Sequence, residues 1–166
     1  MVPCGDEKHM HQMTPLLFVC GVILISPTLV QADLDTFGRN DSQQCDVPVD
    51  IGPVSMTDGG VNFSIALLPD GEVVGWGSST SGQTDVPVWM QPATQVVAGG
   101  RHVVALLEDG SVECWGLNSH GQIDSPNSLS DAIFIAAGDH HSAAVRADGS
   151  VLCWGGNEYG QSLSQP

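Results

Sequence analysis

Two histidines, His102 and His141, are the side chains best suited to metal or acid–base chemistry, and they lie 39 residues apart. Imidazole is a common metal ligand and can act as an acid or a base near neutral pH. Both histidines hold one position of a repeated sequence pattern, in which Phe63 stands in the earliest copy. The repetition favours a packing or hydrogen-bonding role over a metal or acid–base role.

The other residues that could do chemistry lack the neighbours that such chemistry needs. Ser64, Ser111 and Ser150 are not set in the sequence of a nucleophile elbow. The Asp-Gly pairs at 70–71, 109–110 and 148–149 lack the alternating oxygen ligands of a calcium loop, and turns explain them fully. No Cys-x-x-Cys or Cys/His spacing indicates zinc. The sequence therefore predicts a protein that is not an enzyme and that has no metal and no cofactor.

Three cysteines, Cys45, Cys114 and Cys153, follow the apolar N-terminal segment. An odd number cannot all pair within one chain. Cys114 and Cys153 hold the same position in successive repeats, and stacked sheets lie about 10 Å apart, whereas a disulfide needs Cα atoms within about 7 Å. We therefore expect these two to be small buried apolar residues with inert thiols.

Residues that depart from the repeat are the better candidates for binding, because packing of the repeat does not require them. Trp89 and Met90 lie in a loop between units, where the other copies have Asp50-Ile51 and Ser128-Leu129. His120 and Tyr159 precede a recurring Gly-Gln pair, where the first copy has Ser81. Aromatic and Met side chains in loops are typical binding anchors. Trp89 is predicted either to bind a protein partner or to cover the edge of a sheet.

The structural units that position these residues are predicted from a sequence repeat. The repeat is 39 residues long and recurs without insertion or deletion. Between 96–122 and 135–161, 14 of 27 positions are identical. A fixed period of this size is the signature of stacked units that bury their faces against neighbours. The residues that define the repeat are Gly60, Gly99, Gly138, His102, His141, Gly71, Gly110, Gly149, Trp76, Trp115, Trp154, Gly77, Gly116, Gly155, Gly82, Gly121, Gly160, Gln83, Gln122 and Gln161.

Each unit has the pattern of about three short strands. In the second unit, residues 95–98 and 102–107 are apolar runs separated by glycines, and the second run is apolar on both faces. Asp109-Gly110 then predicts a hairpin turn into a third strand over 111–115. Such units cannot stand alone, so they cover one another, with the Trp between neighbours. The fold class is all-β, a β-propeller of about three blades plus a terminal strand, with an open solenoid as the rival architecture.

The phase of the repeat predicts the domain organisation. Residues 33–52 form the last strand and loop of a partial blade, because Phe37 aligns with Trp76. The repeats then occupy 53–91, 92–130 and 131–166. Since a closed propeller normally needs about four to eight blades, we expect either a fragment of a longer protein, the favoured view, or self-association of two copies to complete a ring.

The N-terminus has the pattern of an export signal. Residues 16–25 (LLFVCGVILI) are an apolar core too short to span a bilayer, and Ala32 suits cleavage before Asp33. Residues 1–32 are therefore predicted to be a signal peptide, which makes the protein secreted or periplasmic with no stable membrane anchor. A buried first strand or an uncleaved anchor is the alternative.

Charge limits the partners. The chain has 19 Asp and Glu against 4 Lys and Arg, a net charge of −15. Binding to a phosphate backbone needs clustered Lys and Arg, so nucleic acid is excluded as a partner. An acidic field would steer a basic protein surface or a cation toward the chain, although the charge could also serve only to keep it in solution.

The pattern Ala98-Gly99-x-x-His102-x-x-Ala105-Leu106-x-x-Asp109-Gly110-x-Val112-x-Cys114-Trp115-Gly116-x-Asn118-x-x-Gly121-Gln122 resembles the regulator of chromosome condensation repeat, in its short bacterial form. The same superfamily includes β-lactamase inhibitor protein II. Many secreted members look as if they carry a Cys where this chain has Val104 and Ala143. The resemblance implies a propeller that acts as a protein-interaction scaffold through its loops, or alternatively a secreted enzyme inhibitor. Nucleotide exchange on a small GTPase, the activity of the namesake, is disfavoured: the namesake has longer repeats, is nuclear and binds chromatin, and chromatin binding does not suit a net charge of −15.

Overall fold

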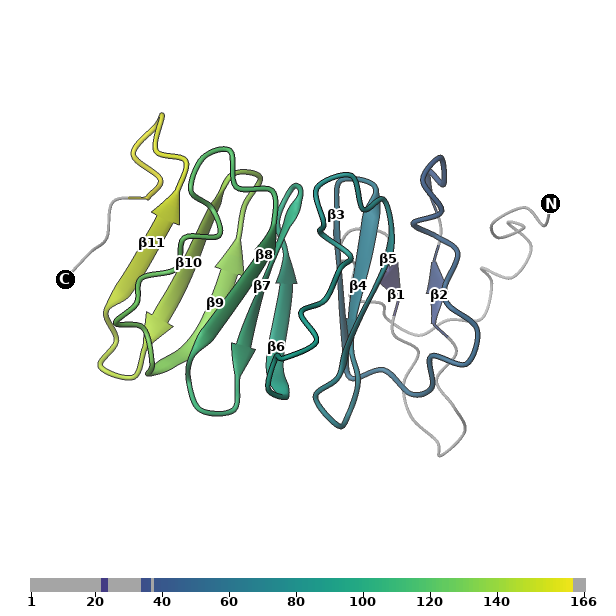
Figure 1. Ribbon diagram of the computed structural model, residues 1–166, viewed down its shortest axis with the longest axis horizontal. Helices are drawn as coiled ribbons and strands as arrows, with labels where there is room; N and C mark the ends of the chain where they lie inside the picture. The colour runs from purple at the N-terminus through teal and green to yellow at the C-terminus, as the bar shows by residue number, and fades with distance from the viewer. Residues whose placement is uncertain (1–21, 24–33, 37, 163–166) are drawn as a thin grey trace.

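Three antiparallel three-stranded sheets make up most of the computed structural model, which describes residues 22–23, 34–36 and 38–162 (Figure 1). The predicted all-β class is confirmed. The predicted signal peptide and its cleavage site lie outside the described residues, except for Val22–Ile23, and so does Phe37. Within the described ranges, no helix is long and apolar enough to cross a membrane.

The strands recur in steps of the repeat, and in each sheet the middle strand lies between the other two. The first sheet has β3 (Met56–Gly60), β4 (Phe63–Leu67) and β5 (Val73–Gly77). The second has β6 (Ala93–Ala98), β7 (His102–Leu107) and β8 (Val112–Gly116). The third has β9 (Ala132–Ala137), β10 (His141–Arg146) and β11 (Val151–Gly155). A two-residue strand, β1 (Val22–Ile23), pairs with β2 (Asp35–Thr36) ahead of them.

The Asp-Gly pairs form the predicted hairpin turns. In the first sheet the Leu68 N–H donates to the Glu72 carbonyl at 2.8 Å, and the Gly71 N–H donates to the Leu68 carbonyl at 3.0 Å. Gly71 has a φ of 86°, the left-handed conformation that ends a three-residue hairpin loop. The turns gather at one end of the sheets, which we call the turn end; it is the lower end in Figure 1. The opposite end carries the loops with the Gly-Gln pairs and is called the Gly-Gln end.

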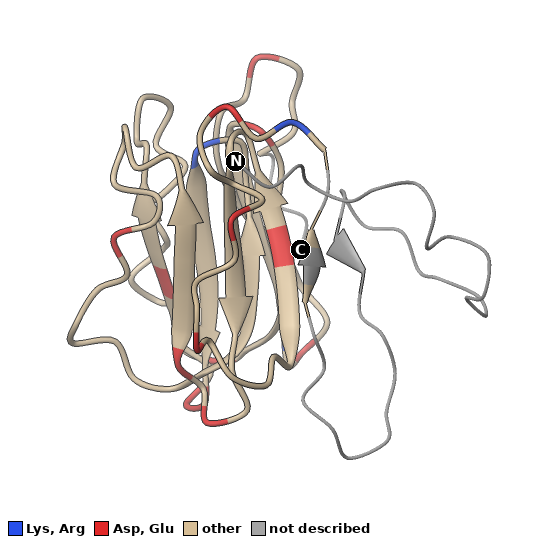
Figure 2. Ribbon diagram, turned by 90° about the vertical axis from the view of Figure 1, so that its right-hand side faces the viewer, with Lys and Arg blue, Asp and Glu red and all other residues tan. Residues whose placement is uncertain are grey.

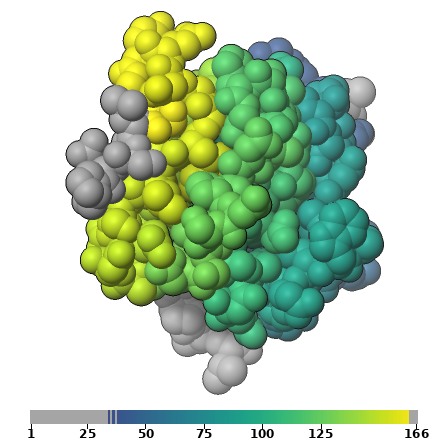
Figure 3. Space-filling view, turned by 60° about the vertical axis from the view of Figure 1, so that its left-hand side comes forward, coloured from purple at the N-terminus to yellow at the C-terminus, as the bar shows by residue number. Residues whose placement is uncertain are grey.

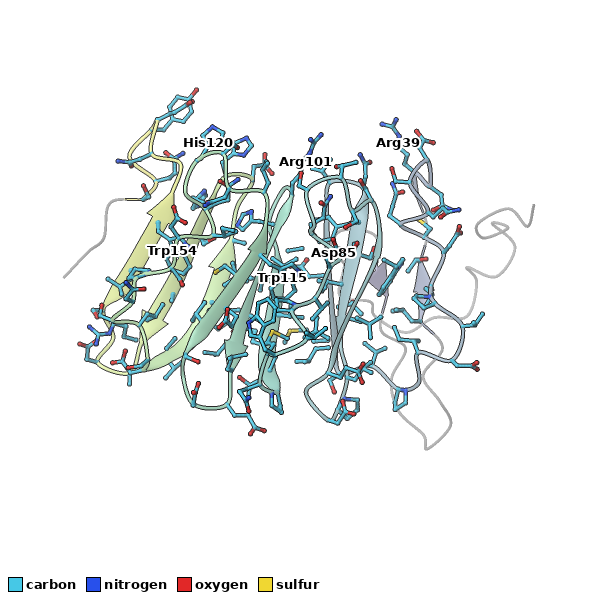
Figure 4. All side chains as sticks on the ribbon, viewed as in Figure 1. Arg39, Asp85, Arg101, Trp115, His120 and Trp154 are labelled. Atoms are coloured by element: carbon cyan, nitrogen blue, oxygen red, sulfur yellow. The ribbon has the colours of Figure 1, made fainter. Side chains whose placement is uncertain are left out.

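Successive sheets are joined by a hydrogen bond from a Trp indole to a Gln backbone carbonyl. Trp115 Nε1 donates to the Gln83 carbonyl and Trp154 Nε1 to the Gln122 carbonyl, both at 3.0 Å. Trp76 Nε1 donates to the Gln44 carbonyl at 2.9 Å, so the loop after β2 covers the first sheet in the same way. Figure 4 shows Trp115 and Trp154 between the sheets. The predicted position of the Trp between neighbouring units is therefore confirmed.

The Gln that supplies this carbonyl also closes its own loop. The side-chain Oε1 atoms of Gln83 and Gln122 accept the N–H groups of Ser81 and His120, each at 2.8 Å. Both glutamines are almost fully buried, at 1% and 0% exposed. One residue thus satisfies the loop with its side-chain oxygen and the next sheet with its backbone carbonyl. The buried Nε2 of Gln122 has no hydrogen-bond partner among the described residues.

The first strands of the sheets add a second set of bonds between units. Asp58 on β3 accepts the N–H of Ala98 on β6 at 2.9 Å. Gln95 on β6 donates to the carbonyl and accepts the N–H of Ile135 on β9, at 3.3 and 3.1 Å. Because β6 contacts β3 and β9 directly, the first strands lie together, as the innermost strands of a propeller do.

Two apolar cores lie between the sheets. Every residue of β4 and β7 is buried, as expected for middle strands that are apolar on both faces. Val103, Ala105 and Leu107 face the first sheet, and Val104 and Leu106 face the third. The sheets follow one another from teal through green to yellow in the space-filling view (Figure 3). On β9, Ile133 and Phe134 are 61% and 53% exposed.

We predict that Trp115→Phe destabilises the protein more than Trp154→Phe. Both changes keep an aromatic ring and remove the indole donor. The Gln122 carbonyl keeps a second donor, the Ser142 hydroxyl at 2.8 Å, whereas the equivalent position in the second sheet is Val103, which has no hydroxyl. Leaving a buried carbonyl unpaired costs about 1–3 kcal/mol. We expect a loss of about 2 kcal/mol for Trp115→Phe and about half of that for Trp154→Phe, measured by urea unfolding. Equal losses would contradict this account.

Candidate interaction surface at the turn end

A surface turn places two apolar side chains in solvent at the turn end. The Met90 N–H donates to the Pro87 carbonyl at 3.1 Å, which puts Val88 and Trp89 at the centre of the turn. Their side chains are 96% and 72% exposed. Met90 turns inward and packs against the core between the first two sheets.

The next unit builds the same turn with polar residues. The Leu129 N–H donates to the Pro126 carbonyl at 2.9 Å, and Asn127 and Ser128 lie at its centre. Leu129 is buried in the second core, at the position that corresponds to Met90. The fold therefore needs the inward residue of this turn and does not need Val88 or Trp89. Exposed apolar side chains that packing does not require are candidates for binding.

An open groove of about 400 Å³ runs between this loop and the hairpin turn of the first sheet. The loop wall consists of Val86, Pro87, Val88, Met90, Gln91 and Pro92, and the hairpin wall consists of Asp70, Gly71, Glu72 and Val73. The two walls are fixed to each other, because the Ala93 N–H donates to the Gly71 carbonyl at 3.0 Å. A Cβ at Gly71 would lie 2.6 Å from the Cβ of Pro92, so glycine permits this close approach.

The four predicted binding residues lie at opposite ends of the sheets. Trp89 and Met90 are at the turn end, and Met90 lines the groove. His120 is at the Gly-Gln end (Figure 4), where its ring stacks on that of His140 with centroids 4.6 Å apart. Tyr159, 91% exposed, lies in the loop after β11, also at the Gly-Gln end in Figure 1. The structure thus brings the four residues together as two pairs, and they do not form one surface.

The acidic members of the groove, Asp70 and Glu72, were missed by sequence reasoning. The signal was present, because Glu72 stands where the other units have Ser111 and Ser150. Each of these serines donates its N–H and its hydroxyl to the Asp two residues before it. These bonds hold the pKa of Asp109 and of Asp148 below the usual value. In the first unit the Glu72 N–H donates to Asp70 at 3.0 Å, and the Ser hydroxyl is replaced by a second carboxylate.

Charge at the turn end is predominantly acidic. Acidic residues lie at both ends of the sheets (Figure 2). Arg146 is paired with Asp131, with the Arg Nε 2.7 Å from the carboxylate. Arg39 pairs with Asp41 at 2.6 Å, and Arg101 lies at the Gly-Gln end (Figure 4). Among the described residues, no cation forms an ion pair with Asp70 or Glu72.

His102 is part of a buried hydrogen-bond chain between the second and third sheets. Its Nε2 lies 2.9 Å from the Ser142 hydroxyl, which donates its own proton to the Gln122 carbonyl. The His102 Nε2 must therefore carry the proton, and its buried Nδ1 has no hydrogen-bond partner. A Cβ at Gly99 would collide with the His102 ring. The hydrogen-bonding role predicted for His102 is confirmed.

His102 is fully buried, whereas Cys114 and Cys153, predicted to be buried, are only half-buried. The surroundings of His102 and Cys114 make both side chains poorly suited to acid–base or thiolate chemistry. Burial, together with the nearby His141 and His140, lowers the pKa of His102 from 6.5 to about 4. Burial, assisted by Glu113 and Asp124, raises the pKa of Cys114 to about 12, so its thiol stays protonated. Cys114 lies opposite Val104, and Cys153 lies opposite Ala143. These are the positions at which the family resemblance implied a within-blade partner.

The described part of the chain brings no three His, Cys, Asp or Glu side chains into a group that could hold a metal ion. The surface features that remain are loops and a groove on a rigid stack of sheets. These features define the class of protein: a repeat-built propeller whose blades carry loops at both ends.

Comparison with known families agrees with this class. The regulator of chromosome condensation (RCC1) repeat matches residues 57–83, 93–122 and 132–161, which is more than half of the chain. The chain belongs to this repeat family. No protein among those with curated descriptions matches it.

Solved propellers share the fold. The ectodomain of the receptor kinase CR4 from Physcomitrella patens matches with a TM-score of 0.55 and 28% identity, over 62% of this chain and 29% of that one. The ectodomain of the Arabidopsis thaliana receptor kinase ACR4 gives 0.57 and 22%, over 72% and 42%. Prp20p from Saccharomyces cerevisiae, described with its binding to Gsp1p and histones, gives 0.55 and 21%, over 66% and 32%. The chain therefore spans less than half the length of these proteins.

We predict that the buried His102 makes stability depend on pH. Its pKa is lower in the folded state, so its contribution is complete above pH 6.5 and is lost as the pH falls toward 4, where the unfolded chain gains the proton first. The loss is about 3 kcal/mol between pH 7 and pH 4. A double variant, His102→Phe with Ser142→Val, copies the Phe63 and Val103 pair of the preceding interface. Urea unfolding at pH 7 and pH 4 should show the loss of stability due to His102 in the wild type and not in the double variant. An equal loss of stability in the double variant would show that His102 is not its cause.

Proposed function

We propose that this chain is an exported interaction module whose RCC1-type blades hold a protein-binding surface at the turn end. The observation that carries the proposal is the Val88–Trp89 turn beside the groove. The same turn is polar in the next unit, so an exposed Trp is not a requirement of the fold. Trp is the residue type most enriched at the energetic centres of protein interfaces.

The proposal treats the repeat as a scaffold and the loops as the functional part. Three sheets joined by buried hydrogen bonds keep the groove walls in place without a partner. A preformed surface loses little conformational entropy when it binds. The loops at the Gly-Gln end, with His120 and Tyr159, are a second predicted contact surface, and a partner at the turn end would not cover it.

Export is supported by the apolar segment over 16–25 and by the small residue at 32. The alternative is that this segment stays in the protein, and the pairing of β1 with β2 is consistent with that alternative. Cleavage would remove β1 and leave β2 with the mature chain.

The export prediction has a direct measurement. The full chain, expressed with a C-terminal tag in a host that secretes proteins, should reach the medium or the periplasm with Asp33 as its first residue. Intact-mass analysis and N-terminal sequencing would show this. Replacing Leu17 and Val19 with Asp interrupts the apolar core and should keep the protein inside the cell. Recovery of an exported chain that retains residues 1–32 would show an uncleaved segment and contradict the signal assignment.

The interaction surface can be tested by site-specific photo-crosslinking. A photo-reactive amino acid at Gln91, which lines the groove, should capture a discrete protein from the exported fraction of the source organism. Mass spectrometry identifies the product. Trp89→Ser, which places the residue of the next unit in the turn, should reduce the yield at least fivefold, because it removes the exposed aromatic ring.

Val49→Ser removes another exposed apolar side chain, outside the groove, and is the matched control; it should leave the yield unchanged. A photo-reactive group at Ser128 reports on the polar version of the same turn and should capture little. Equal capture from positions 91 and 128 would contradict a binding surface at the first unit.

A further inference from the structure

Two departures from the repeat converge on the groove. Glu72 stands where the other units have Ser, and Trp89 stands where the next unit has Ser128. Glu72 lines the hairpin wall, and Trp89 lies in the opposite loop, between Val88 and Met90, which line the groove. Neither residue is needed for packing, since the other copies fold with serine in place of Glu72 and with Asp50 or Ser128 in place of Trp89.

The hairpin wall has a surplus of negative charge. Asp70 and Glu72 place two exposed carboxylates within three residues, and no cation of the described chain pairs with them. Like charges this close repel each other, and a cation from outside would relieve the repulsion. With three arginines among the described residues and a net charge of −15 overall, the chain has few cations to supply from its own surface.

The loop wall is apolar. Val86, Pro87 and Met90 line it together with Gln91. Trp89 is exposed and lies in the same turn, between the lining residues Val88 and Met90, without lining the groove itself. A ligand suited to both walls has an apolar stem and a cationic head. Arginine fits this description better than lysine, because its planar guanidinium can pair with carboxylates through two N–H groups and can stack on an indole face.

We propose that the groove binds an arginine side chain presented by an extended segment of a partner protein, with apolar residues on either side of the arginine. The guanidinium lies between the carboxylates of Asp70 and Glu72 and the ring of Trp89, and the methylene stem lies against Pro87 and Met90. This proposal rests on the function proposed above and specifies the partner's chemistry.

The test uses the full chain and a fluorescein-labelled peptide, Gly-Ser-Leu-Arg-Leu-Ser-Gly, with fluorescence anisotropy as the readout. Versions with Lys or Glu in place of Arg are the matched probes. We expect the Arg peptide to bind at least threefold more tightly than the Lys peptide, and the Glu peptide not to bind detectably. Raising the salt from about 0.05 to about 0.3 M should weaken binding, because the carboxylates are exposed.

Variants assign the binding to the groove. Glu72→Ser and Trp89→Ser should each weaken binding of the Arg peptide at least fivefold. Both place the residue of another unit in the first unit, and a thermal melt verifies that they fold. Glu108→Gln removes another exposed carboxylate, that of the first residue of the next hairpin turn. The Glu108 N–H donates to the Pro92 carbonyl, but Glu108 does not line the groove, so this variant should have no effect.

Unchanged binding in both groove variants, or equal binding of the Arg and Glu peptides, would overturn the inference. If crosslinking at Gln91 captures a protein but the Arg peptide does not bind, this inference fails and the interaction surface stands. If neither experiment succeeds, both fail. A doubled solution mass that Arg101→Gln and Trp89→Ser each abolish would show that a second copy occupies the groove and would also overturn the inference.

Discussion

The bond from a Trp indole to a Gln carbonyl is the contact on which the rest of the architecture depends. Each sheet is apolar on both faces and cannot be stable alone, so its position relative to the next sheet must be specified. Apolar packing is not directional, whereas a buried hydrogen bond with a distance of 3.0 Å is. The Gln carbonyl is available only if the loop before it is closed, and the Gln side chain closes that loop. Loop, sheet and neighbour therefore form one cooperative unit.

The pair of residues that face each other beside this contact is either polar at both positions or apolar at both positions. His102 and Ser142 face each other across the second interface and are joined by a hydrogen bond. At the first interface the corresponding positions are Phe63 and Val103, which are both buried and apolar. A mixed pair would leave a buried donor or acceptor without a partner. The glycines before Phe63 and His102 leave space for either ring, so the backbone accepts both solutions.

Much of the fold could be predicted from the sequence, because the same pattern of strand and turn residues occurs three times. Strand and turn positions come from apolar runs and Asp-Gly pairs, and the placement of Trp follows from its recurrence. The hydrogen bonds that Asp58 and Gln95 make to neighbouring sheets could not be predicted. Each occurs in one unit only and depends on which strands lie innermost. The groove could not be predicted either, because Glu72 and Trp89 are separated in sequence. Their segments meet through the bond from Ala93 to Gly71 and through shared packing of Val73 and Met90 in one core. The separation of Trp89 from His120 required knowing at which end each loop lies.

Comparison of the repeats also shows which positions packing does not constrain. Met90 and Leu129 hold the same inward position, so Met90 is explained by packing even though it lines the groove. Val88 and Trp89, two residues and one residue before Met90, have no such explanation. In the hairpin turns of the second and third units, the hydroxyls of Ser111 and Ser150 donate hydrogen bonds to the neighbouring aspartates. In the first unit, Glu72 instead adds a negative charge. The fold tolerates serine at these two positions, yet this chain exposes an indole at one and a carboxylate at the other. Binding of a partner is the best explanation for such residues. In this chain two such residues flank one groove.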